Sequence, residues 1–111
     1  MDELSIIPFK TFVRDVKKLK KRYKNILSDI EEFKNILLET PDIGTSLGHG
    51  IYKVRVKNSS KNQGKSGGYR VITCFIDENS MVYLVKMYDK GEIESIKTSK
   101  LMELIEDELG E

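Results

Sequence analysis

The apolar residues of this 111-residue chain change their spacing part-way along the sequence. Before Pro41 most of them recur every three or four residues, a spacing that places side chains on one face of a helix. After Gly50 they alternate with polar residues or form β-branched and aromatic runs, which is typical of strands. A helical first part followed by a β-rich second part predicts an α+β fold, with helices packed on one face of a sheet.

The first part of the chain is predicted to hold one strand and two helices. The predicted ranges are an edge strand at Leu4–Phe9 and helices at Lys10–Lys24 and Ile26–Leu37. Pro8 suits an edge position because it cannot donate a hydrogen bond to a second neighbouring strand. Pro41 biases its predecessor away from helical geometry, so the second helix is expected to end before it. The two helices are expected to form a hairpin.

The second part is predicted to hold three strands and a final helix. The predicted ranges are strands at Ile51–Lys57, Tyr69–Asp77 and Met81–Asp89, and a helix at Thr98–Leu109 with Thr98 as its cap. Turn-forming and polar residues predict loops at Pro41–Gly50 and Asn58–Gly68, and the second loop is expected to be mobile.

These elements predict one domain over residues 1–111. Its fold class is α+β, with an N-terminal strand and a helical hairpin packed on an antiparallel sheet, and a short C-terminal helix. The composition has 39% hydrophobic and 33% charged residues. The sequence shows no apolar run long enough to span a membrane and no secretory signal pattern, so a cytoplasmic protein is expected. Cys74 is the one cysteine and lies in an apolar run, where it is expected to be a small buried hydrophobe.

Acidic residues are absent from the segment between Ile43 and Ile76, although the net charge of the whole chain is only +1. The cations of this segment are Lys53, Arg55, Lys57, Lys61, Lys65 and Arg70. In a strand, Lys53, Arg55 and Lys57 would share one face and the apolar residues between them the other. The apolar set must cover the core, so the cations are expected on an open face that binds a polyanion.

A bland interpretation of this face is that lysines keep the surface soluble and protect a strand from aggregation. A merely solvated face usually mixes both signs of charge, however, and this one does not. Arg70 strengthens the functional interpretation, because its planar guanidinium suits bidentate phosphate contact. Gly67 and Gly68 just before it would let the backbone approach a ligand closely.

Other sites are weaker candidates. Gly64-Lys65-Ser66 resembles the end of a phosphate-binding loop, but Ser59 stands where that motif needs a glycine, and a strand rather than a helix is predicted after the motif. Lys65 is therefore interpreted as a cation on a loop that reaches a phosphate. His49 is the one histidine, and it lies between glycines in a loop. The sequence offers no cluster of metal ligands, so neither a metal nor another cofactor is expected.

The end of the last predicted strand adds two candidates. Tyr88 would either pack in the core or stack on an unpaired RNA base, while Lys90 would hold a phosphate.

These segments resemble the RelE/ParE superfamily of bacterial toxins, in particular its RelE/HigB-like branch. Ile51-Tyr52-Lys53-Val54-Arg55-Val56 and Gly68-Tyr69-Arg70-Val71-Ile72 are similar to the paired basic strands of RelE toxins, and the run from Tyr88 to Glu92 also fits. The lysine-rich helical hairpin extends the resemblance over nearly the whole chain. After the last strand the sequence departs from the pattern, because Ile93 and Lys97 stand where RelE has an arginine and a tyrosine.

The resemblance implies a metal-independent endoribonuclease that cuts mRNA in the ribosomal A site and is inhibited by a small, DNA-binding antitoxin. A proton must move in such a cleavage, and Lys53 or Lys90 is the hypothetical general base. It implies functional roles for Lys53, Arg55 and Arg70, with Lys90, Tyr88 and Lys97 as substitutes for the missing groups. The predicted catalytic residues are therefore Lys53, Arg55, Arg70 and Lys90, and the predicted RNA-binding residues Lys57, Lys65, Tyr88 and Lys97. Two alternatives stay open: a ParE-like inhibitor of DNA gyrase, and a non-catalytic RNA- or ribosome-binding module.

Overall fold

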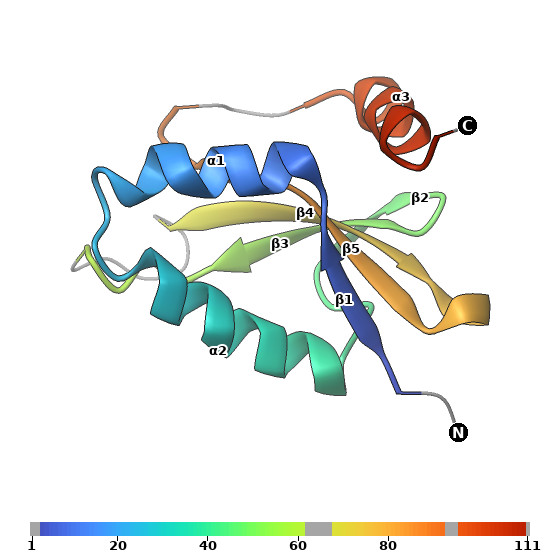
Figure 1. Cartoon of the computed structure of the whole chain (residues 1–111), viewed down its shortest axis with the longest axis horizontal. Coiled ribbons are helices and arrows are strands. Elements are labelled where there is room, and N and C mark those ends of the chain that lie inside the picture. Colours follow the sequence, from blue (N-terminus) through green and yellow to red (C-terminus); the bar gives the residue numbers. More distant parts are fainter. Residues whose placement is uncertain (1–2, 62–67, 93–95, 111) are drawn as a thin grey trace.

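A computed structural model describes residues 3–61, 68–92 and 96–110 of the chain, and over these residues the fold is α+β (Figure 1). Its elements are β1 (Ser5–Pro8), α1 (Lys10–Lys20), α2 (Ile26–Glu39), β2 (Thr45–Gly48), β3 (Ile51–Val56), β4 (Tyr69–Ile76), the 3-10 turn η2 (Asp77–Asn79), β5 (Met81–Asp89) and α3 (Thr98–Glu108). The predicted helices and strands are all present, with ends that differ by a few residues.

The strands form one sheet in the order β1-β5-β4-β3-β2. Neighbouring strands from β5 to β2 run antiparallel, as predicted, whereas β1 pairs with β5 in parallel. Pro8 lies in the edge strand β1, where its missing N–H leaves no ladder bond unmade. The prediction of an N-terminal edge strand is therefore confirmed.

The segment Pro41–Gly50 is not a plain loop, because it contains the edge strand β2. Thr45 and Ser46 pair with Lys53 and Tyr52 of β3, and a tight turn with positive φ at His49 joins the two strands. The prediction was wrong because β2 is short and mostly polar, so it carries no apolar alternation. His49 thus occupies a left-handed turn position at which non-glycine residues are uncommon.

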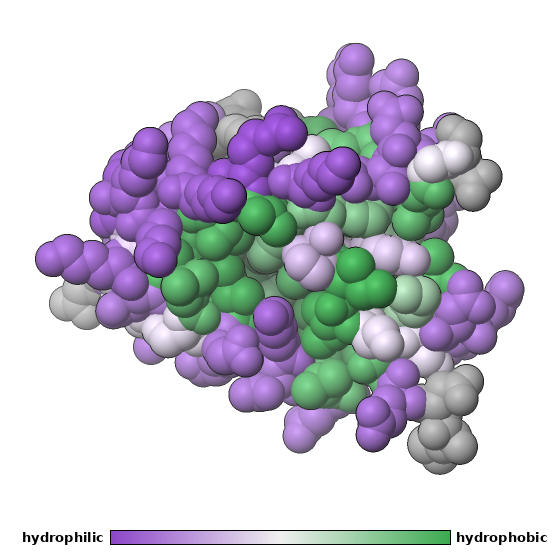
Figure 2. All heavy atoms as spheres, in the orientation of Figure 1, coloured by the Kyte–Doolittle hydropathy of each residue, from purple (hydrophilic) through white to green (hydrophobic). Residues whose placement is uncertain are grey.

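The helices α1 and α2 form the predicted hairpin and cover one face of the sheet (Figure 1). The first helix ends at Lys20 rather than Lys24, and the turn that follows carries Tyr23 into the core. Figure 2 shows green apolar residues exposed among purple side chains. The exposed apolar side chains of the hairpin include those of Val13 and Leu27. No helix within residues 3–61, 68–92 and 96–110 is long and apolar enough to cross a membrane.

The opposite face of the sheet is covered in part by α3. Leu101 and Ile105 of α3 pack in a second core with Ile72, Cys74 and Tyr88. The expectation that this whole face is open was therefore wrong, although Cys74 is buried as predicted, and burial raises the pKa of its thiol.

The start of α3 also differs from its prediction. The N-cap is Lys97 rather than Thr98, and no side chain caps the helix by a hydrogen bond. Thr98 is instead the first residue of the helix, three residues before the buried Leu101.

The predicted mobile loop at Asn58–Gly68 falls largely on residues 62–67, which lie outside the described residues. Its first part is fixed to the fold: Asn58 is 1% exposed, and the backbone N–H of Ser59 donates to the Asp29 carboxylate at 3.0 Å. At the other end, a Cβ on Gly68 would come within 2.3 Å of the Val56 carbonyl oxygen. This glycine therefore allows two backbone segments to approach each other, rather than a backbone to approach a ligand.

Candidate functional site

The four predicted catalytic residues line one hollow on the part of the sheet that α3 leaves uncovered. Lys53 and Arg55 come from β3, Arg70 from β4 and Lys90 from the residue after β5. Thr45 and Tyr88 complete the lining of a volume of about 340 Å³. None of these described lining residues is acidic, so the hollow presents positive charge to solvent.

The register of the sheet explains why these side chains meet. Arg55 lies opposite Arg70, and Arg70 lies opposite Tyr88, so one row of residues crosses three strands. Lys53 is two residues before Arg55 and therefore lies on the same face, opposite Thr45 of β2. Like charges directly opposite each other destabilise a sheet, so the fold accepts a cost to bring these cations together.

A bulge in β5 decides which face Tyr88 occupies. Ile72 pairs with Lys86 while Thr73 pairs with Leu84, which leaves Val85 as an extra residue on β5. The alternation of faces shifts there by one residue, so Leu84 and Met87 both pack on the hairpin side. Tyr88 consequently lies on the side of the hollow and Asp89 on the side of the hairpin.

Arg70 is the most buried cation of the hollow. It is 7% exposed, whereas Arg55 opposite it is an exposed residue. One Nη of Arg70 donates to the carbonyl oxygen of Tyr69 at 3.1 Å, which orients the guanidinium. Burial lowers the pKa of Arg70, and the charge of Arg55 lowers it further. An anion entering the hollow would offset both effects.

Tyr88 lines the hollow but has little free ring surface. It is 4% exposed and packs with Ile72 and Leu101 in the second core. Burial raises the pKa of its hydroxyl, and Arg70 opposes this shift. The structure therefore places Tyr88 in the packing role, and base stacking on this ring would require surface that the second core now covers.

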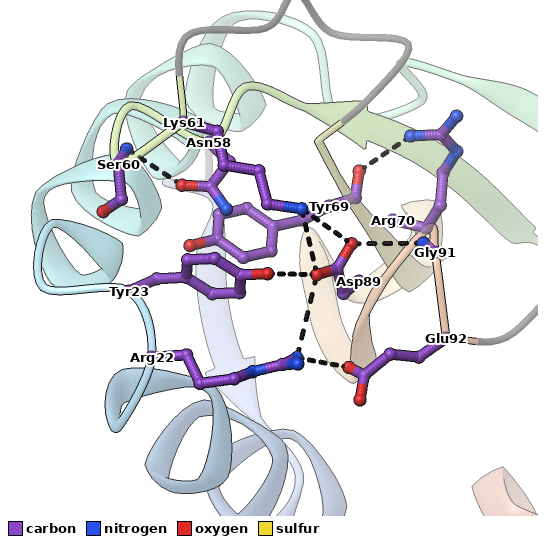
Figure 3. A network of polar contacts seen from close by, with 10 residues as sticks. All are labelled: Arg22, Tyr23, Asn58, Ser60, Lys61, Tyr69, Arg70, Asp89, Gly91 and Glu92. Atoms are coloured by element: carbon purple, nitrogen blue, oxygen red, sulfur yellow. Dashed lines mark hydrogen bonds and ion pairs between the residues drawn. The ribbon is translucent and has the colours of Figure 1, made fainter.

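On the other side of the same sheet end lies a set of polar contacts that we call the Asp89 network (Figure 3). Its members are Arg22, Tyr23, Lys61, Asp89 and Glu92. The Tyr23 hydroxyl and the Lys61 ammonium donate to Asp89 Oδ2, the latter at 3.2 Å. Arg22 Nη2 lies 3.7 Å from the same oxygen and 2.6 Å from Glu92 Oε1. Figure 3 shows the Arg70 guanidinium pointing away from this network.

Asp89 is an ionised group in a buried position. It is 4% exposed, and burial alone would raise its pKa. Hydrogen bonds from the Tyr23 hydroxyl, the Gly91 N–H and Lys61 outweigh burial, so the pKa of Asp89 is lowered. Sequence patterns indicate this network only indirectly, because they predict a helix position for Tyr23 and a mobile loop for Lys61.

Comparison with known proteins identifies the family. The family model of the RelE toxin of the RelE/RelB toxin–antitoxin system matches residues 5–107. The chain belongs to the RelE toxin family.

Solved structures agree with this fold. A mutant of the E. coli toxin RelE in the free state aligns with a TM-score of 0.56 and 17% sequence identity, covering 92% of this chain and 93% of the other. The same mutant in complex with an antitoxin RelBc peptide aligns with a TM-score of 0.55, again at 17% identity and with the same coverage. At this level of identity the likeness concerns the RelE fold alone.

Among the other predicted RNA-binding residues of this RelE-family toxin, the described Lys57 and Lys97 do not line the hollow. Lys57 follows the end of β3 and lines a different depression, shared with Asp29 and Glu32. Lys97 is an exposed residue at the N-cap of α3, and Lys65 lies outside the described residues. The predicted RNA-binding set is therefore spread over several surfaces, whereas the predicted catalytic set is compact.

The hollow suits a phosphodiester better than a metal ion. Arg55 and Arg70 present guanidinium groups, which bind phosphate in a bidentate manner, and Lys53 and Lys90 add mobile point charges. Within residues 3–61, 68–92 and 96–110 no three His, Cys, Asp or Glu side chains are grouped so that they could hold a metal ion.

Proposed function

We propose that this RelE-family toxin is an mRNA endoribonuclease that acts on the ribosome and thereby inhibits translation. The observation that carries the proposal is the hollow in which Lys53, Arg55, Arg70 and Lys90 converge, with no acidic residue in its described lining. Four cations within one small volume match a site at which a phosphate gains negative charge. Membership of a toxin family gives this chemistry a biological setting.

The proposed reaction uses the RNA as its own nucleophile. The 2′-hydroxyl attacks the adjacent phosphorus, the bond from phosphorus to the 5′-oxygen breaks, and the products are a 2′,3′-cyclic phosphate and a 5′-hydroxyl. Arg55 and Arg70 would neutralise the additional charge on the pentacoordinate phosphate, which is the kind of electrostatic stabilisation that contributes most to many enzymes. This route requires no enzyme nucleophile and no metal.

Two protons must move in this reaction. A base removes the proton of the 2′-hydroxyl, and an acid protonates the departing 5′-oxygen. Lys53 enters the hollow from β3 and Lys90 from the turn after β5, so one could serve on each side of the phosphate. We assign these two lysines as the hypothetical base and acid, and the ribosome would supply much of the remaining alignment of the RNA.

The proposal can be tested on a translating ribosome system with a defined mRNA. The purified toxin should produce new mRNA ends that carry a 2′,3′-cyclic phosphate. A single 2′-deoxy nucleotide at the mapped cut should abolish that cut, because the nucleophile is then missing. Arg55→Ala should reduce cleavage by about 100-fold, the usual effect of losing one charge-stabilising group. Arg55 is exposed, so this change should leave the fold intact.

Two further variants make the result specific. Arg70→Lys keeps the charge but loses the planar guanidinium, and it should also impair cleavage strongly. Lys100→Ala removes a cation whose side chain is 73% exposed on α3, and cleavage should be unchanged. If Arg55→Ala and Lys100→Ala behave alike, the hollow is not the active site.

The same assay separates the two alternative functions. Intact mRNA together with trapped gyrase–DNA complexes would show a ParE-like inhibitor and overturn the nuclease. RNA binding with strong salt dependence, but without new ends, would show a non-catalytic binding module.

We also propose that a small, DNA-binding antitoxin covers the hollow with an acidic segment. The absence of acidic side chains from its described lining favours such a partner. Arg55→Glu should weaken the complex and make its formation less sensitive to salt. Leu27→Ser, a change at an exposed apolar residue of α2, should have a smaller effect. The reverse order would place the antitoxin on the helical hairpin instead.

A further inference from the structure

Asp89 lies between two residues of the hollow without facing it. Tyr88 and Lys90 line the hollow, whereas the Asp89 side chain points to the opposite side of the sheet and meets Tyr23 and Lys61 (Figure 3). The backbone of Asp89 is therefore shared by the hollow and by the Asp89 network. When contacts hold the Asp89 carboxylate on one side of the sheet, the side chains of Tyr88 and Lys90 are directed toward the other side.

The contacts around Asp89 restrain the segment that carries Lys90. Asp89 Oδ1 accepts a hydrogen bond from the Gly91 N–H at 3.1 Å, and the Lys90 N–H donates to the Gly68 carbonyl oxygen at 3.2 Å. Lys90 thus sits in a turn that is tied both to the Asp89 side chain and to the start of β4. A lysine after the last residue of a strand would otherwise have a loosely held backbone.

Tyr23 links this turn to Arg70 as well. Its ring meets the Tyr69 ring edge-on, with centroids 5.7 Å apart and an interplanar angle of 81°. Tyr69 lies opposite Asp89 in the sheet, and its carbonyl oxygen accepts the hydrogen bond from Arg70. Through its hydroxyl and its ring, Tyr23 therefore contacts the chain neighbours of both Lys90 and Arg70.

We infer that Asp89, held by Tyr23 and Lys61, is a positioning residue that sets Lys90 and Arg70 for the reaction of the hollow. This inference rests on the proposed nuclease function. Asp89 need not touch RNA for this role, since it acts through the backbone. A buried carboxylate is expensive to maintain, and apolar residues of similar size would pack the same space at less cost. The presence of this buried carboxylate next to the cationic hollow is explained if it orients the neighbouring residues.

The test compares two tyrosines that each lose only a hydroxyl group. Tyr23→Phe keeps the ring contact with Tyr69 but removes the hydrogen bond to Asp89. Tyr83→Phe is the matched control, because within the described part of the chain the Tyr83 hydroxyl donates only to the sulfur of Met81, at 3.6 Å, near the other end of β5. In the ribosomal cleavage assay Tyr23→Phe should lower kcat about tenfold with little change in KM, since misplaced groups impair the chemical step. Tyr83→Phe should leave both constants unchanged.

A second measurement does not depend on RNA cleavage. Amide hydrogen exchange at Lys90 reports the bond from its N–H to Gly68. Tyr23→Phe should accelerate exchange at Lys90 about tenfold relative to Tyr83→Phe, while the central residues of β4 exchange at similar rates in both variants. Uniform acceleration across the sheet would indicate a purely structural role and overturn the inference.

The two assays also separate this inference from the proposed function. If the wild-type toxin cuts no RNA, the nuclease proposal fails, and local exchange at Lys90 then decides whether Asp89 orders the hollow. If the wild-type toxin cuts RNA but Tyr23→Phe has the wild-type kcat, the nuclease proposal stands and the positioning role is overturned.

Discussion

The two faces at one end of the sheet carry the same kinds of cation in opposite settings. On one face, Arg22 and Lys61 surround the buried carboxylate of Asp89. On the other face, the described lining of the hollow brings Arg55 and Arg70 together with two lysines and contains no acid. In the Asp89 network the protein supplies the anion itself, whereas the described lining of the hollow supplies no acidic side chain.

This difference separates charges that stabilise the fold from charges that weaken it. Removing one partner of a buried ion pair is costly, because the remaining charges stay in a poorly solvated place. Removing one of several clustered cations relieves repulsion, because Arg55 lies directly opposite Arg70 in the sheet. The two faces should therefore respond to substitution with opposite signs of stability change.

The largest expected effect is on the stability of the Asp89 network. Asp89→Ala should lower the free energy of unfolding by about 3 kcal/mol, because Tyr23 and Lys61 lose their shared acceptor. Arg55→Ala should change it by less than about 0.5 kcal/mol, or raise it. Urea titrations followed by circular dichroism measure both values. Equal destabilisation by the two variants would remove the distinction between the faces.

The next largest effect concerns RNA binding. Lys53→Ala should weaken RNA binding and reduce the slope of log affinity against log salt by about 0.7, because one phosphate contact is lost. Lys61→Ala removes the same charge from the Asp89 network and should leave the slope unchanged, since Lys61 is occupied by Asp89. Fluorescence anisotropy with a single-stranded RNA at several salt concentrations measures both slopes. A reduced slope for Lys61→Ala would extend the RNA path around the sheet end.

A smaller effect is expected from pH. The pKa of Asp89 is lowered in the folded protein, so its ionisation stabilises the fold at any pH above its unfolded value, near 4. That contribution should fall away as the pH drops below about 4 and passes through the folded pKa. The groups that face this carboxylate are Arg22, Tyr23 and Lys61, with Glu92 beyond Arg22.

The matching comparison is the stability difference between the wild type and Asp89→Asn at several pH values. It should be constant from about pH 5 to 7 and shrink below about pH 4, because protonated aspartate resembles asparagine in charge. Urea midpoints at each pH measure this difference. A difference that grows on acidification would mean that the pKa of Asp89 is raised rather than lowered in the folded protein.

Much of this architecture could be predicted from residue periodicity. The spacing in α1 and α2 and the alternation in β3 indicate which side faces the core. The β-branched run in β4 predicts a strand, and the structure buries that strand on both faces. Periodicity does not predict the strand β2, because its four residues hold a single large apolar side chain, Leu47. Periodicity also does not predict the parallel pairing of β1 with β5, because it does not specify which strands are neighbours in the sheet.

The hollow was predictable only in part, for a related physical reason. Alternation places Lys53 and Arg55 on one face, and β4 follows as the antiparallel partner that brings Arg70 opposite. The bulge at Val85, which turns Tyr88 toward the hollow, has no signature in a run of apolar residues. The Asp89 network joins residues that are 66 positions apart in the sequence, as for Tyr23 and Asp89, so no local pattern contains it.

The smallest expected effect concerns Lys57. The sequence pattern places Lys57 on the same strand as Lys53, but in the structure Lys57 does not line the hollow. It lines a depression with Asp29 and Glu32, so part of its field is cancelled by nearby acids. Lys57→Ala should weaken RNA binding by about twofold or less in 0.15 M salt, where charges more than about 8 Å apart are largely screened. Lys53→Ala under the same conditions is the comparison. A loss for Lys57→Ala as large as that for Lys53→Ala would show that the bound RNA continues past the end of β3 toward α2, and the hollow would then be one part of a longer binding surface.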